Sequence, residues 1–224
     1  MKINLLKELI EGYKKHIINR DISPIEYHWE TYSNFIESWD LEAIDLSGMF
    51  EKSFHSKMSL RLWKHENYYP KEAMLRFIEQ DKEFVRVMFM DLFYGKSDLN
   101  LRTNKFLHYC DEMTRIIQKK NKKFDQHYHQ NHEMIFVYLS FIEPINYTFL
   151  NESAFNKFMT KLEAKSLPRS FEPEYFVRMI NAVRKFLFQD EEFATQLEQK
   201  LSHLNLMHYS STFWLSDFIR ISSR

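Results

Sequence analysis

Apolar residues recur along much of the chain at steps of three and four positions, the spacing that places side chains on one face of an α-helix. The clearest stripe predicts a helix that docks by one face on a core, and it comprises Trp29, Tyr32, Phe35, Ile36 and Trp39. Similar spacing recurs toward both ends of the chain, so we expect a fold built mainly from amphipathic helices.

Residues that typically start or end helices lie between these apolar stripes. Pro70 and Pro173 stand where proline is tolerated, in the first turn of a helix. Asp81 and Asp190 precede apolar stripes and are predicted to be N-caps, because a carboxylate can accept hydrogen bonds from the free amides of the first turn. Gly95 is the predicted end of the helix that Asp81 begins.

Two segments after Gly95 bear on function. A long helix is predicted to end in a lysine-rich connector, and its apolar positions are Leu99, Phe106, Cys110, Met113 and Ile117. Residues 133–142 form a continuous apolar run, which periodicity cannot assign to a buried helix or a strand, and we interpret it as a helix. Residues 145–150 are rich in β-branched and aromatic side chains, which favours a short extended piece.

Composition supports an all-α fold, because 3 Gly and 5 Pro in 224 residues are too few for the tight turns of a β-sandwich. We predict a single compact multi-helix domain, with a leading helix in 1–26, a main body in 27–166 and C-terminal helices in 167–224. The single cysteine, Cys110, excludes a disulfide within the chain. No apolar stretch is long enough for a membrane span, and we expect a cytoplasmic protein without membrane partners.

Charge is balanced overall but segregated along the chain, with 31 Lys and Arg against 31 Asp and Glu. The stretch from Asp21 to Glu51 holds eight acids and no Lys or Arg, and it is a candidate docking surface for a protein partner. The stretch from Arg115 to His132 holds five Lys and Arg against Asp125 alone. Basic residues interleaved with aromatic rings suit nucleic acid, whereas lysines at a helix end also complement the helix dipole.

The basic stretch supplies the predicted nucleic-acid-binding residues. The predicted phosphate contacts are Lys119, Lys120, Lys122, Lys123, His127 and His129. Tyr128 is the predicted stacking residue, because an aromatic ring can pack against a nucleobase.

The sequence gives only weak indications of a metal, cofactor or catalytic site. His127, His129 and His132 are a possible ligand set for zinc or copper, but their spacing matches no zinc motif and no fourth ligand is specified, so we predict no metal. The three glycines are isolated and form no phosphate-binding loop. We therefore predict no cofactor and no catalytic residue.

Arg102 and His108 have the arginine, spacer and histidine order of HEPN-like helical ribonucleases, in which arginine stabilises phosphate charge and histidine moves a proton. Six residues of helix place the two side chains about 120° apart, so such a site would need a second chain. The alternative is that Arg102 pairs with a carboxylate such as Asp98, one turn earlier.

Several phrases resemble the N-terminal region of McrB-like proteins, the AAA+ motor subunits of modification-dependent restriction systems. They are NYYPKEAMLRFIEQDKEFVRVMFMDLF at 67–93, DLNLRTNKF at 98–106, HYHQNHEMIFVYLSFIEPINYTFL at 127–150 and SDFIRISSR at 216–224. The resemblance extends from about Trp29 to the last residue and rests on helical packing patterns with a few polar anchors.

The resemblance implies a specificity or recruitment role: reading DNA, including modified DNA, for an AAA+ motor ring and an McrC-like nuclease subunit. In the family, acidic residues follow the HYQ of this turn. This chain instead has His129, Gln130, Asn131 and His132, so no role for those acids carries over. The family's motor domain would follow Arg224. We therefore predict a non-enzymatic DNA-recognition module, with a scaffold that docks a motor or senses a phage protein, or a ribonuclease, as alternatives.

Overall fold

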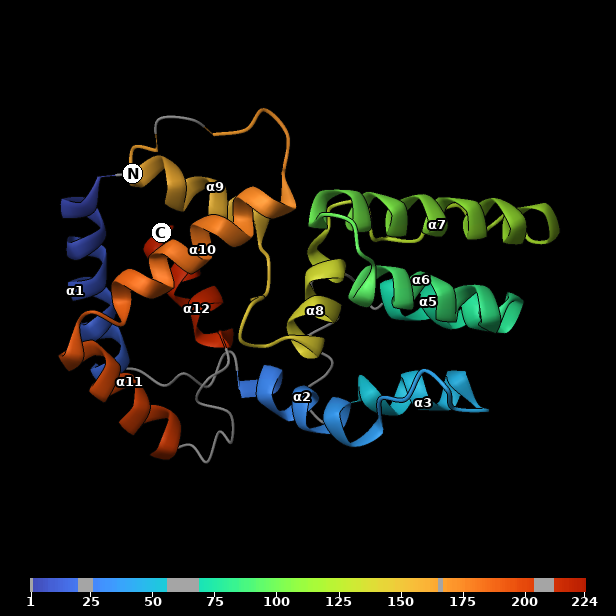
Figure 1. Ribbon diagram of the computed structural model, residues 1–224, viewed down its shortest axis with the longest axis horizontal. Helices are drawn as coiled ribbons and strands as arrows, with labels where there is room; N and C mark the ends of the chain where they lie inside the picture. The colour runs from blue at the N-terminus through green and yellow to red at the C-terminus, as the bar shows by residue number, and fades with distance from the viewer. Residues whose placement is uncertain (1, 20–25, 56–68, 165–166, 204–211) are drawn as a thin grey trace. The chain divides into compact units, whose positions relative to one another are not determined.

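The computed structural model describes residues 2–19, 26–55, 69–164, 167–203 and 212–224, and all regular elements in them are α-helices (Figure 1). The predicted all-α fold class is thereby confirmed. The helices are α1 (Ile3–Asn19), α2 (Glu26–Ser38), α3 (Leu46–Ser53), α5 (Tyr69–Gln80), α6 (Lys82–Tyr94), α7 (Leu99–Lys120), α8 (Glu133–Ile142), α9 (Glu152–Lys161), α10 (Pro173–Leu187), α11 (Glu191–His203) and α12 (Phe213–Ser222).

The chain divides into two compact units. The first unit comprises Met1–Trp29 and Glu143–Arg224, and the second comprises Glu30–Ile142. The second unit therefore contains the whole basic stretch and the long helix α7 that leads into it.

Helix α8 forms the centre of the second unit's core. Its residues from Met134 to Phe141 are all buried, which confirms the helix predicted for this apolar run and explains why it shows no amphipathic period. The ring of Tyr138 packs near the rings of residues on α3, α6 and α7, with centroid separations of 6.3 Å to Phe50, 5.2 Å to Phe89 and 6.0 Å to Phe106. This aromatic cluster holds four helices on one core.

Helices α5, α6 and α7 pack against one another in the second unit (Figure 1). Asp81 begins α6 as predicted, since its side chain accepts a hydrogen bond of 3.0 Å from the Phe84 amide. Gly95 ends α6, also as predicted, and a Cβ at this position would collide with the Asp91 carbonyl oxygen. The chain then reverses within four residues into α7, whose first-turn amide at Leu101 is capped by the Asp98 side chain.

The predicted stripe on α2 is correct except at one position. Within the second unit, Tyr32 and Phe35 are buried, and Trp39 stacks on Phe35 with ring centroids 4.8 Å apart. The prediction for Ile36 is wrong, because its side chain is 51% exposed. Ile36 follows Tyr32 by four residues and so lies on the same side of the helix, but the spacing alone does not show where the buried face ends.

The first unit is organised around buried polar contacts as well as apolar packing. Tyr13 on α1 donates a buried hydrogen bond of 3.0 Å to Asp217 on α12. Burial and the nearby Asp217 charge hold the pKa of Tyr13 well above its usual value, so the phenol stays protonated. Lys14 lies within 2.8 Å of Asp190 and 3.0 Å of Glu192, an arrangement that ties α1 to the start of α11.

Residues 147–150 of the first unit are buried and belong to neither helix nor strand, so the extended piece expected near 145–150 does not form a sheet in the described residues. Thr212, the residue before α12, is hydrogen-bonded to this segment and to Pro144. The Thr148 hydroxyl donates to the Thr212 carbonyl at 2.7 Å, and the Thr212 amide donates to the Pro144 carbonyl at 2.7 Å. The Thr212 hydroxyl also donates to the Tyr147 carbonyl at 2.5 Å, so the segment is tied to the start of α12.

The aromatic core of the second unit predicts a large cost for truncating Phe89, which is 1% exposed. Phe89→Ala is expected to lower the free energy of unfolding by about 3–5 kcal/mol, because it removes packing on three helices and leaves a cavity. The neighbouring Met90 is 46% exposed, and Met90→Ala is the matched control, with an expected change within about 0.5 kcal/mol. Urea denaturation measures both, and equal losses would contradict this description of the core.

The burial of His28 predicts that the first unit loses stability in acid. Its ring lies 3.7 Å from that of Phe149, and burial lowers its pKa from 6.5 to about 3. The unfolded chain takes up this proton near pH 6.5 but the folded chain only near pH 3, so stability is complete above pH 6.5 and falls as the pH drops between these values.

Between pH 7 and pH 5.5 this histidine is expected to lower the free energy of unfolding by about 1 kcal/mol. His28→Phe keeps an aromatic ring beside Phe149 but cannot bind the proton, so its loss over the same interval should be smaller by that amount. Urea denaturation of both proteins at the two pH values measures the difference. Equal losses would show that His28 does not stay neutral in the folded state.

Candidate functional site

The connector between α7 and α8, residues 121–132, is the candidate site, and its first half is a well-anchored turn. The Asn121 amide donates to the Ile117 carbonyl at 2.8 Å, which closes the last turn of α7. The Asn121 side chain accepts a hydrogen bond of 3.1 Å from the Lys123 amide. The Phe124 ring then packs edge-on against Phe77 of α5, with centroids 6.0 Å apart. The backbone that carries the lysines is thus fixed on both sides.

All four predicted lysines lie at the surface of this turn and of the last turn of α7. Lys119, Lys120, Lys122 and Lys123 are exposed, and Lys120 donates a hydrogen bond of 3.0 Å to the Gln80 side chain. In the part of the chain that the structure describes, no salt bridge neutralises any of the four. The lysines therefore form a concentrated positive surface.

The predicted roles of His127 and His129 are wrong. Their side chains are only 2% and 0% exposed, so neither imidazole can reach a phosphate at the surface. Tyr128 lies between them and is half-buried, with a left-handed φ of 60° that bulky residues seldom adopt. This backbone turns both neighbouring histidines to the inside, and the sequence alone does not reveal such a turn.

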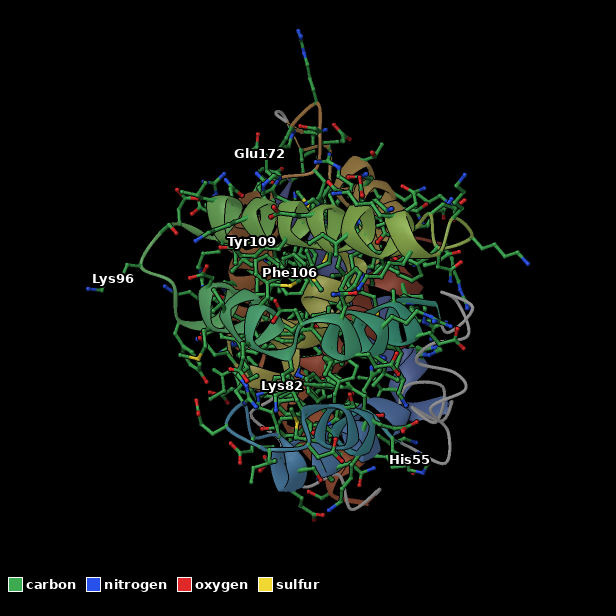
Figure 2. The ribbon with its side chains drawn as sticks, turned by 90° about the vertical axis from the view of Figure 1, so that its right-hand side faces the viewer. His55, Lys82, Lys96, Phe106, Tyr109 and Glu172 are labelled. Carbon is green, nitrogen blue, oxygen red and sulfur yellow. The ribbon has the colours of Figure 1, made fainter. Side chains whose placement is uncertain are left out.

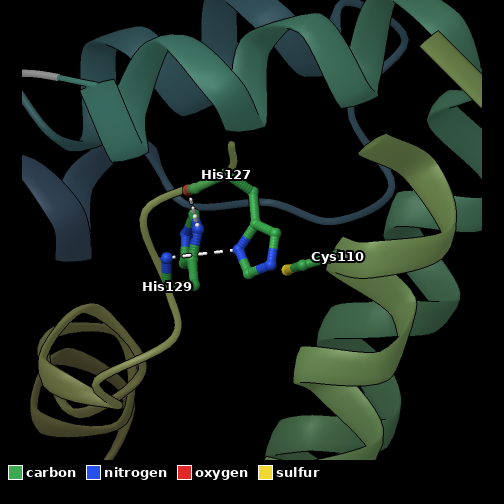
Figure 3. Close-up of side chains that lie close together, drawn as sticks. All are labelled: Cys110, His127 and His129. Carbon is green, nitrogen blue, oxygen red and sulfur yellow. Dashed lines mark hydrogen bonds between the residues drawn. The ribbon is translucent and has the colours of Figure 1, made fainter. Parts of the chain in front are cut away.

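Backbone contacts fix the proton positions of His127. Its Nδ1 accepts a hydrogen bond of 3.2 Å from the His129 amide, so this nitrogen carries no proton in the neutral ring (Figure 3). The proton is consequently on Nε2, which lies 3.1 Å from a carboxylate oxygen of Asp111 on α7. The Asp111 carboxylate accepts this hydrogen bond and orients the ring.

His129 has the opposite tautomer. Its Nδ1 faces the carbonyl oxygen of His127, which can only accept, so Nδ1 carries the proton (Figure 3). The unprotonated Nε2 lies 3.0 Å from the Tyr138 hydroxyl, which donates to it. The connector is thereby joined to the middle of α8 through the core of the second unit.

Neither histidine adds charge to the basic surface at neutral pH. Burial, with a smaller contribution from the neighbouring His127, lowers the pKa of His129 to about 3. Burial also lowers the pKa of His127, although Asp111 opposes this effect. The positive charge of the connector is therefore that of its lysines.

Cys110 of α7 is the residue that sequence reasoning missed at this site. Its thiol is fully buried beside the two histidines, and one potential metal-ligating atom from each of Cys110, His127 and His129 lies within 4.8 Å of the others (Figure 3). Burial raises the pKa of the thiol well above its ordinary value. No spacing motif links position 110 to positions 127 and 129, because they meet only when the connector folds back along α7. Within the described residues His132 is not part of this cluster.

Arg102 and His108 have different surroundings within this chain. The Arg102 guanidinium is partly buried and donates to the carbonyls of Leu92 at 2.7 Å and Phe93 at 3.1 Å, at the end of α6. His108 is exposed on α7. The arginine is thus used to satisfy the last carbonyls of a neighbouring helix, a role that a cation fills well.

The acidic stretch is partly described, since Asp21 lies outside the described residues. Two of its acids, Asp40 and Asp45, have local structural roles. Asp45 caps α3 by accepting from the Gly48 amide at 2.9 Å, and Asp40 accepts from the Glu42 amide at 2.9 Å. Glu37 and Glu42 are exposed. These contacts account for two of the acids without a protein partner.

Comparison of the chain with protein-family models, with curated proteins and with solved structures finds no match. Among the described helices, none combines the length and the apolar character that crossing a membrane requires.

The position of Arg102 yields a test of the ribonuclease interpretation. Arg102→Ala is expected to lower the free energy of unfolding by about 1–3 kcal/mol, because it leaves helix-end carbonyls without their charged donor. His108→Ala, at an exposed position on the same helix, should change it by less than about 0.5 kcal/mol. Neither substitution is expected to change degradation of a model RNA. Loss of RNA cleavage in both variants, with stability unchanged, would contradict the structural role of Arg102.

Proposed function

We propose that this chain is a non-enzymatic, cytoplasmic DNA-recognition module of a restriction or phage-defence system, and that it contacts DNA through the basic end of α7. The carrying observation is the cluster of four exposed lysines without salt bridges in the described structure, presented by an anchored turn. Such a cluster binds phosphates mainly by releasing condensed counterions, which requires unpaired cations at the surface.

The helix dipole alone does not account for this cluster. Lys119 and Lys120 lie in the last turn of α7, where cations stabilise the free carbonyls. Lys122 and Lys123 lie beyond the capping residue Asn121, and the dipole effect falls off beyond the last turn. The second pair therefore calls for another explanation, and a phosphate-binding surface provides one.

The basic surface is short, which limits the mode of binding. Arg115 is exposed and precedes Lys119 by one turn, so it extends the positive face along α7. Asp111 and Glu112 are exposed in the turn of α7 before Arg115, and the positive face ends at these two acids. A footprint of this length contacts only a few phosphates. Tyr128, which is partly exposed at the far end of the connector, is the proposed stacking residue.

The resemblance to McrB-like N-terminal regions supports the choice of DNA and suggests the partners. In that setting the chain would deliver target recognition to an AAA+ motor ring and an McrC-like nuclease subunit. The phrases that carry the resemblance include α5, nearly all of α6, α8 and the first eight residues of α7, whereas the four lysines lie between two of these phrases and are assigned from local chemistry. The imidazoles of the HYH phrase are buried, so this part of the resemblance concerns packing and not a DNA contact.

Changing Lys119, Lys120, Lys122 and Lys123 to Gln is expected to weaken binding to duplex DNA at least about tenfold at low salt. It should also remove most of the salt dependence of binding. For four phosphate contacts, the slope of the logarithm of the binding constant against the logarithm of salt concentration is about −3.6. Fluorescence anisotropy with methylated and unmodified duplexes over a salt series measures both quantities.

The matched control makes the same charge change at Lys96, Lys157, Lys161 and Lys185, which are all exposed. Lys96 projects into solvent from the turn between α6 and α7 (Figure 2). The control should keep the DNA affinity and the slope of its salt dependence close to those of the unaltered protein. A small loss is expected, because the chain carries four fewer positive charges. Equal weakening in the two variants, or salt-independent binding by the unaltered protein, would contradict the proposal.

A further inference from the structure

We propose that Cys110, His127 and His129 form a binding site for a single zinc-like divalent transition-metal ion inside the second unit. The three side chains are fully or almost fully buried, and one donor atom from each lies within 4.8 Å of the other two. They come from α7 and from the connector, so a bound ion would join two segments that the sequence separates (Figure 3).

The hydrogen bonds leave one nitrogen of each imidazole ring without a proton. Nδ1 of His127 and Nε2 of His129 are unprotonated, because each accepts a hydrogen bond, and an ion would displace the two donors. The opposite nitrogens donate to the Asp111 carboxylate and to the His127 carbonyl oxygen. Metal-binding histidines show this pattern, in which the second ring nitrogen donates to a carboxylate or a carbonyl and thereby fixes the ring.

The donor set selects the class of metal. One thiolate and two imidazoles suit zinc and its neighbours, whereas magnesium and calcium require oxygen ligands. The charge also balances locally. A divalent ion with the Cys110 thiolate leaves one positive charge, and the Asp111 carboxylate, bonded to the His127 ring, offsets it. A buried site therefore does not carry uncompensated charge, which would be costly.

The Tyr138 hydroxyl is the candidate for a fourth ligand, because it adjoins Nε2 of His129 and would lose this hydrogen-bond acceptor to the ion. It is 3.0 Å from Nε2 of His129, close to the edge of about 3.3 Å between two ligands of a tetrahedral zinc site. Separations of up to 4.8 Å exceed such an edge, so the donor atoms must draw together by up to about 1.5 Å on binding. Rotation of the Cys110 side chain can supply part of this movement.

Burial couples metal binding to folding. His127 is 2% exposed and Cys110 is fully buried, so an ion reaches the donors while the connector is open or during folding. The thiol must also release its proton when it binds the metal. Chelators should therefore act slowly on the folded protein, and loading should be efficient during refolding.

The full chain, without a histidine tag, is unfolded with a chelator and refolded with Co²⁺ or Zn²⁺. We expect about one ion per chain by elemental analysis after gel filtration. The Co²⁺ form should show thiolate-to-cobalt charge transfer and the intense visible bands of a tetrahedral ion. The zinc form should also unfold at a higher urea concentration than the metal-free protein.

Cys110→Ser should abolish the charge-transfer band and weaken binding at least about tenfold, and His129→Asn should lower the metal content similarly. His108→Ala is the matched control and should bind like the unaltered protein, because this histidine is exposed on α7. Circular dichroism checks that each variant is helical. An unaltered protein that refolds without bound metal overturns the proposal even where a variant fails to fold. A Cys110→Ser protein with unchanged metal content and spectrum also overturns it.

Discussion

The hydrogen bond between the Tyr138 hydroxyl and Nε2 of His129 is the interaction on which the candidate site depends. Tyr138 is fully buried at the centre of α8, among aromatic side chains that offer its hydroxyl no acceptor. A buried hydroxyl without a partner is costly, so the connector must bring an acceptor to this point. His129 supplies it, and the path of the connector is set by this requirement.

This constraint divides the connector into two halves with different tasks. Burying His127 and His129 draws the later half inward, and the left-handed backbone at Tyr128 makes this possible. The earlier half stays at the surface, where Asn121 and Phe124 hold the turn that presents the lysines. Basic charge and buried imidazoles are thus neighbours in sequence but face different environments, and only the charge is available to a polyanion.

The sequence is a good guide to this fold wherever one local interaction decides the outcome. Asp81 and Gly95 mark the limits of α6 because a cap depends on neighbouring amides and on backbone room. Burial of a polar side chain is different, because it depends on partners far along the chain. The sequence neighbours of His129 do not indicate that Tyr138 needs a hydrogen-bond acceptor. The sequence neighbours of Cys110 do not indicate that two histidines lie beside it in the fold.

The most direct test of this account is the proton position in the two imidazole rings, read from nitrogen chemical shifts by nuclear magnetic resonance. The account predicts that His127 is held with its proton on Nε2 and His129 with its proton on Nδ1, whether or not a metal is bound. The exposed His108 serves as the reference for a ring that exchanges freely between both forms. Free exchange in His127 or His129 as well would contradict the account.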